Sequence, residues 1–138
     1  MRGHRTVPHT ADLRVVAWGE TREDCLAEAV LGMVESFAEM DGLSPRRTAI
    51  RHVTAPTDED LLVAVLDEVI YGMDADDEIP VVLEVKQARD GGVDLVMAVT
   101  DITAIETVGA IPKAVSLHEL ACAADSSGCW QCSVTVDV

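Results

Sequence analysis

The segment from Leu13 to Phe37, LRVVAWGETREDCLAEAVLGMVESF, changes its hydrophobic period at Gly19-Glu20 and so predicts a strand followed by a helix. Residues 13–18 alternate between the two sides of an extended chain, which is the period of a half-buried strand. Thr21 can cap the helix, because a threonine hydroxyl accepts a hydrogen bond from a backbone N–H of the first turn. Apolar residues then recur at spacings of four, three and four, and we expect the helix to end near Asp41-Gly42.

The next segment repeats this order of strand and helix. We expect a short, edge-like strand near 47–54, after which Thr57 and three acidic residues repeat the chemistry of a helix start. The helix should stop around Gly72. Its apolar stripe is wide, which indicates packing against a sheet. The stripe consists of Leu61, Leu62, Val65, Leu66, Val69 and Ile70.

The second half of the chain is typical of antiparallel strands. Residues 81–87 and 93–101 flank a turn rich in glycine, residues 102–112 have no clear period, and strands are expected at 113–124 and 129–137. The resulting order is β-α-β-α-β-β-β-β. It predicts an α+β fold in a single domain, residues 1–138, with a mixed, mostly antiparallel sheet and two helices packed on one face.

The last two strands allow a prediction of register. If Asp125–Gly128 is a four-residue loop, Cys122 faces Gln131, His118 faces Thr135 and Ser116 faces Asp137. Residues that pair directly share a face of the sheet, so this face is polar and ends at Asp137. The opposite face carries Trp130, Cys132, Val134 and Val136 and is expected to be core.

Length and charge restrict the classes of function. The chain has 138 residues and a formal net charge of −15, so it repels phosphate backbones, and we expect no direct binding of nucleic acid. Such a surface suits a cation or a basic partner, although solubility alone accounts for most of the charge. No apolar run is long enough to span a bilayer, and Met1–Arg5 lacks the apolar core of a signal peptide. We expect a cytoplasmic protein with reduced cysteines.

Carboxylates near both ends of the chain form the main candidate site. Asp12 opens the first predicted strand, and Asp137 lies beside the terminal carboxylate of Val138. Oxygen donors of this kind suit Ca²⁺ or Mg²⁺. The alternatives are a local hydrogen bond of Asp12 to its own backbone and a solvated Asp137, and spacing alone leaves them open.

Three further side chains are weaker candidates. His9 and His118 are able to ligate a metal or to bond a carboxylate, but each also fits an ordinary turn or surface position. Lys113 follows Pro112 at the start of a predicted strand, where a lysine is normally solvated.

The pair Cys129 and Cys132 has the C-x-x-C spacing of zinc and redox sites. In a strand, this spacing sends the two thiols to opposite faces. We therefore expect Cys132 in the core and Cys129 partly exposed at the end of a loop.

Taken together, these residues resemble the archease family. The resemblance covers essentially the whole chain, and its most specific part is the combination of three separate motifs. They are Pro8-His9-Thr10-Ala11-Asp12, Lys113-Ala114-Val115-Ser116-Leu117-His118, and Trp130 through Asp137-Val138. Departures from the family pattern fall at Asp67, at Thr100-Asp101 and at Ser116-Leu117.

The resemblance implies a helper protein rather than an enzyme. Archeases are activators of the RtcB-type RNA ligase of tRNA splicing and RNA repair, which uses Mn²⁺ and GTP to guanylylate its own histidine. The family member promotes this step and multiple turnover, and it binds a divalent cation, typically Ca²⁺, with Mg²⁺ or Mn²⁺ as alternatives. Carried over to this chain, the ligands are Asp12, Asp137 and the carboxylate of Val138. Lys113, His9 and His118 match further family positions.

Two other functions remain open from the residues themselves. One is a small metal-dependent hydrolase that uses Asp12 and Asp137 and turns over without a partner. The other is a redox or chaperone-like binding module that uses Cys129 and Cys132. The first lacks a general base or nucleophile beside the carboxylates, and the strand register disfavours the second.

Overall fold

The computed structural model describes residues 1–8 and 12–138 and has the predicted α+β class. Both predicted helices and all six predicted strands are present, and the described chain adds three further strands and a short 3-10 helix. In chain order the elements are β1 (Gly3–Pro8), β2 (Asp12–Gly19), α1 (Arg22–Glu35), β3 (Ala38–Glu39), β4 (Arg47–Val53), α2 (Asp58–Ala75), β5 (Glu78–Gln87), β6 (Val93–Asp101), η1 (Ile102–Ala104), β7 (Glu106–Thr107), β8 (Ala114–Ala124) and β9 (Trp130–Asp137).

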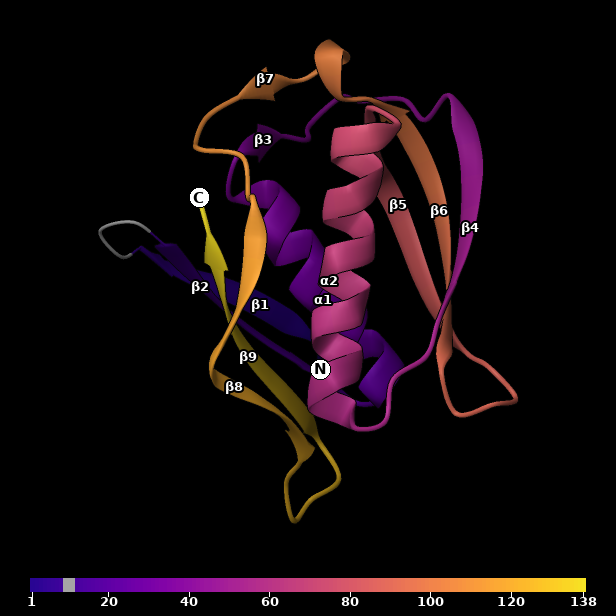
Figure 1. Ribbon diagram of the computed structural model, residues 1–138, viewed down its shortest axis with the longest axis vertical. Coiled ribbons are helices and arrows are strands. Elements are labelled where there is room, and N and C mark those ends of the chain that lie inside the picture. The colour runs from indigo at the N-terminus through magenta and orange to yellow at the C-terminus, as the bar shows by residue number, and fades with distance from the viewer. Residues whose placement is uncertain (9–11) are drawn as a thin grey trace.

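The strands are divided between two sheets and a short ribbon, whereas the sequence predicted one sheet. The strand orders are β1-β2-β9-β8, β4-β6-β5 and β3-β7. Every ladder among the described strands is antiparallel. Figure 1 shows the helix pair between the two larger sheets, and both helices contact strands of each sheet.

One hydrophobic core joins the two sheets through the helices. Along β6 the buried residues alternate with half-buried ones, which is the pattern of a strand covered on one face. In β9, Cys132, Val134 and Val136 are buried as predicted. The apolar stripe of α2 is buried at Leu61, Leu62, Val65, Leu66 and Val69 and lies in the same cluster.

Both predicted helix caps are present. The hydroxyl of Thr21 accepts a hydrogen bond from the backbone N–H of Asp24 at 3.0 Å, and that of Thr57 accepts one from Asp60 at 3.1 Å. The end predicted for the first helix was wrong, because α1 stops at Glu35. Beyond it, the Phe37 ring is fully buried while the Phe37 carbonyl accepts a hydrogen bond from Val108 N–H at 2.7 Å. The apolar residue at the expected spacing thus belongs to the core but not to the helix.

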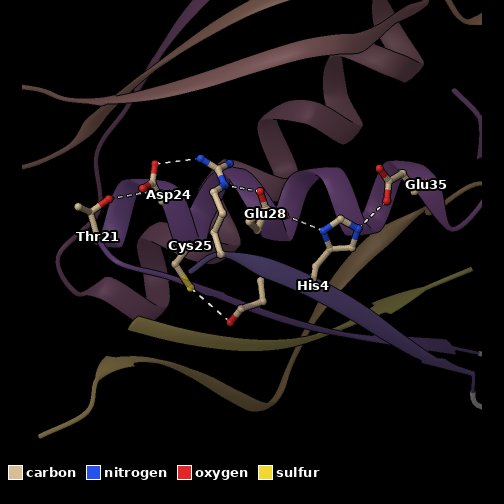
Figure 2. A network of polar contacts seen from close by, with 8 residues as sticks. His4, Thr21, Asp24, Cys25, Glu28 and Glu35 are labelled. Carbon is tan, nitrogen blue, oxygen red and sulfur yellow. Dashed lines mark hydrogen bonds and ion pairs between the residues drawn. The ribbon is translucent and has the colours of Figure 1, made fainter. Parts of the chain in front are cut away.

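Strand β1 was not predicted, because its sequence contains few apolar residues. Polar contacts hold it on α1 (Figure 2): the His4 ring lies between Glu28, 2.8 Å from Nδ1, and Glu35, 2.5 Å from Nε2. Arg2 donates to the second oxygen of Glu28 at 2.5 Å. Gly32 favours this close packing, since a Cβ there would lie 3.1 Å from the His4 ring, which is closer than an ordinary van der Waals contact.

Neither described helix is both long and apolar enough to cross a membrane.

Candidate cation site at the ends of the chain

Asp12 and Asp137 lie directly opposite each other at the end of the ladder between β2 and β9. Residues paired in this way share a face, with Cβ atoms roughly 5 Å apart. The next pair, Leu13 and Val136, points to the other face, where Val136 is fully buried. The two carboxylates therefore lie on the face away from the core, with Asp12 half-buried and Asp137 exposed.

Val138 directly follows Asp137 in the chain. Its side chain is partly buried against the hydrophobic core, which restrains the backbone beside Asp137. The carboxylates of Asp12 and Asp137 are hard oxygen donors, the class of ligand that Ca²⁺ and Mg²⁺ prefer. In residues 1–8 and 12–138, side chains of His, Cys, Asp and Glu form no group of three that could hold a metal ion.

The structure places one of the three weaker candidates beside the carboxylate pair and another on the exposed surface, and the third lies outside the described residues. Lys113 lies beside the carboxylate pair, since its backbone N–H donates to the carbonyl oxygen of Asp137 at 2.8 Å. The His118 side chain is 86% exposed, and Nε2 is 3.9 Å from a carboxylate oxygen of Glu119. His9 falls outside the described residues.

The register predicted for the last hairpin was wrong by one residue at the loop. Ala124 pairs with Trp130 and Cys122 with Cys132, so the loop includes Cys129. Asp125 stabilises this longer loop: one carboxylate oxygen accepts hydrogen bonds from the backbone N–H groups of Ser127 at 2.8 Å and Cys129 at 3.1 Å.

An irregularity in β8 shifts the register a second time. Ala121 pairs with Ser133, but the next pair is Ser116 with Thr135, and between them Glu119 adopts a φ of 56°. His118 lies in this stretch and does not face Thr135. Ala114, rather than Ser116, lies opposite Asp137. The residue opposite Asp137 is thus an alanine, whose side chain has no atom that could bind a cation.

Cys25, Cys122 and Cys132 form a buried cluster, whereas the two cysteines of the C-x-x-C sequence are separated between the core and the surface. Cys129 is exposed and Cys132 is buried, as predicted. The sulfur of Cys132 lies 2.8 Å from that of Cys25 and 3.1 Å from that of Cys122. The prediction that Cys122 shares the polar face was wrong, because the register shift turns it into the core. Hydrogen bonds from both neighbours and burial raise the pKa of the Cys132 thiol, which leaves it unreactive.

Comparison with known proteins assigns the chain to a family. Residues 4–138 match the model of the Archease protein family (MTH1598/TM1083). A probable protein archease of Mycobacterium tuberculosis (strain H37Rv) is 52% identical over 136 residues, which are 99% of this chain and 75% of that protein. The chain belongs to the archease family.

More distant members agree with this assignment. A protein archease of Methanosarcina barkeri is 25% identical over 135 residues, covering 94% of this chain and 92% of that protein. The solution structure of Methanobacterium thermoautotrophicum protein 1598 has the same fold, with a TM-score of 0.77, 23% identity and 99% of both chains covered. The α+β fold inferred from the sequence is therefore the fold of a solved structure.

Proposed function

We propose that this chain is a divalent-cation-binding activator of an RtcB-type RNA ligase, acting in the cytoplasm in tRNA splicing and RNA repair. It promotes the GTP-dependent guanylylation of the ligase and supports multiple turnover, and it is not itself an enzyme. Membership of the archease family supports this role. GTP and Mn²⁺ are used by the ligase, and the chain does not contact nucleic acid directly.

The structural observation that supports the proposed cation site is the pairing of Asp12 with Asp137. These two carboxylates and that of Val138 hold the cation, with Ca²⁺ as the expected ion and Mg²⁺ or Mn²⁺ as the alternatives with the same ligand class. Three negative groups held close together repel one another, and a divalent cation offsets this repulsion. Lys113 lies at the edge of this site through its backbone contact with Asp137, and His9 and His118 are proposed as further contacts to the ligase.

The experiment measures guanylylation of a purified RtcB-type ligase from the same source, with GTP and Mn²⁺, with and without this chain. We expect strong stimulation by the wild type and at least a tenfold loss of it in Asp12→Asn and Asp137→Asn, because each replacement removes one charged ligand. Calorimetric titration with Ca²⁺ should show at least tenfold weaker binding for the same variants, which corresponds to about 1.4 kcal/mol.

The matched control is Glu84→Gln, which removes one exposed charge on β5 without touching the site. It should leave both stimulation and Ca²⁺ affinity unchanged. Full stimulation by both Asp12→Asn and Asp137→Asn would contradict the proposal. A third variant with two residues added after Val138 moves the terminal carboxylate and should weaken Ca²⁺ binding as well.

A further inference from the structure

A groove of about 880 Å³ runs between the C-terminal half of α2 and the segment 102–113. Figure 1 shows this segment passing the C-terminal end of α2 before it enters β8. One contact fixes it there: the backbone N–H of Ile102 donates to the carbonyl oxygen of Asp77 at 2.7 Å. The groove is therefore bounded by two segments that are joined by a hydrogen bond.

The floor of the groove is apolar and open to solvent. Ile70, Met73, Ile102 and Pro112 line it, together with Tyr71 and Ile111. Tyr71 is 59% exposed and Ile111 is 43% exposed, although both are large apolar side chains. An exposed apolar surface of this kind, surrounded by polar residues, is typical of a place where another protein binds.

The edge of the groove is negatively charged. Asp67 and Asp74 lie one turn to either side of Tyr71 on α2, and Asp77 follows the helix. In residues 1–8 and 12–138 no ion pair reaches any of these three aspartates, whereas neighbouring Glu68 lies 3.4 Å from Arg51. Burial raises the pKa of Asp67, so its charge is incompletely solvated. A cation supplied by a partner would offset this cost.

One end of the groove lies next to the backbone of Asp137. This end is formed by Pro112, which is buried, and by Lys113, whose backbone N–H donates to the carbonyl of Asp137 at 2.8 Å. A partner segment lying in the groove would therefore end near the backbone of Asp137.

We propose that this groove binds a basic amphipathic segment of the ligase, in which large apolar side chains are flanked by lysine or arginine. The inference rests on the proposed function and adds to it a division of labour: the groove provides affinity and the carboxylate site provides stimulation. A second copy of this chain is a poor occupant, because each copy has a net charge of −15. An RNA backbone is excluded for the same reason.

The test is a titration of the chain into the ligase guanylylation assay, from which the half-saturating concentration and the plateau are both obtained. Asp67→Lys, Asp74→Lys and Tyr71→Ala should each raise the half-saturating concentration at least tenfold and leave the plateau unchanged. Asp137→Asn should lower the plateau. The controls are Glu84→Lys, with the same charge reversal on β5, and Val82→Ala, whose side chain has the same 59% exposure as Tyr71.

Half-saturating concentrations within twofold of the wild type in all three groove variants would overturn the inference, while stimulation itself would still support the proposed function. If the wild-type chain does not stimulate the ligase, a second measurement tests on its own whether the groove binds a basic amphipathic segment. Its probe is a fluorescent synthetic peptide with leucines at i, i+3, i+4 and i+7 and lysine elsewhere.

In that second measurement, fluorescence anisotropy should show binding of the peptide to the full chain and at least tenfold weaker binding to Asp67→Lys and Tyr71→Ala. The same peptide with glutamate in place of lysine should not bind. Equal binding of the basic peptide to wild type and variants would overturn the inference about the groove, whatever the result of the ligase assay. Melting curves of every variant should show an unchanged midpoint, because the substituted residues are exposed.

Discussion

At the scale of single residues, His4 illustrates how two carboxylates tune one imidazole. Burial disfavours the charged ring, but the hydrogen bonds that the ring donates to Glu28 and Glu35, and the charges of these carboxylates, outweigh burial, so the pKa of His4 is raised. For Glu28, burial opposes ionisation, yet His4 and Arg2 hold its pKa below the usual value. The protonated ring therefore links β1 to α1 through two charge-assisted hydrogen bonds.

Replacement of His4 by glutamine should cost stability in a manner that depends on pH. Because the pKa of His4 is higher in the folded state, its contribution is complete below the unfolded value of about 6.5 and disappears as pH rises through the folded value. We expect a loss of about 1 kcal/mol at pH 5.5, allowing for solvent screening of the partly exposed pairs. Urea unfolding of wild type and His4→Gln across pH 5.5 to about 9 measures it.

The control for this prediction is His118→Gln, since the His118 side chain is 86% exposed. It should leave the unfolding midpoint unchanged at every pH. A difference between wild type and His4→Gln that grows with rising pH would contradict the assignment of His4 as a charged link.

At the scale of elements, the sequence predicted helix starts better than strand partners. Thr21 and Thr57 were identified because a cap is a local event that involves only the next three residues. The register of β8 and β9 depends on the loop conformation at Asp125 and on the positive φ of Glu119, and neither has a sequence signal as strong as a cap. Strand β1 depends on contacts to α1, which lie far away in sequence.

For the candidate site and the groove, too, the sequence predicted one feature and missed the other. The two aspartates were identified from their positions at the chain ends, and the structure places them opposite each other. The groove along α2 was not predicted, because Tyr71 and Ile111 appear in the sequence as ordinary apolar residues of a helix and a loop. Only the packing of segment 102–113 shows that their side chains stay exposed.

The cap of α2 gives a prediction at this scale. Thr57→Ala removes the acceptor for the Asp60 N–H and should lower the free energy of unfolding by about 1 kcal/mol. Thr57→Ser keeps the hydroxyl and should recover most of the loss. Chemical denaturation of the three proteins compares these values. An equal loss in the serine and alanine variants would show that the methyl group, rather than the hydrogen bond, is responsible.

At the scale of the whole molecule, we predict that the chain unfolds as one cooperative unit, because one core connects both sheets. Leu66 is fully buried in α2, so Leu66→Ala should lower the free energy of unfolding by about 2–5 kcal/mol. Tryptophan fluorescence reports on Trp18 and Trp130 in the larger sheet, and far-UV circular dichroism reports on the helices. Both signals should shift together in Leu66→Ala.

The control is Ile50→Ala, whose side chain is 69% exposed on β4 and should change stability by less than about 0.5 kcal/mol. Two separate transitions, one seen by fluorescence and one by dichroism, would contradict a single cooperative core.

In the proposed site, the antiparallel pairing of β2 with β9 couples cation binding to folding, because it is this pairing that brings Asp12 and Asp137 together. An unfolded chain does not hold the two aspartates opposite each other, so the proposed site is absent from it. A ligand that binds only the finished fold stabilises it by mass action, by about 2.7 kcal/mol at a concentration one hundred times its dissociation constant.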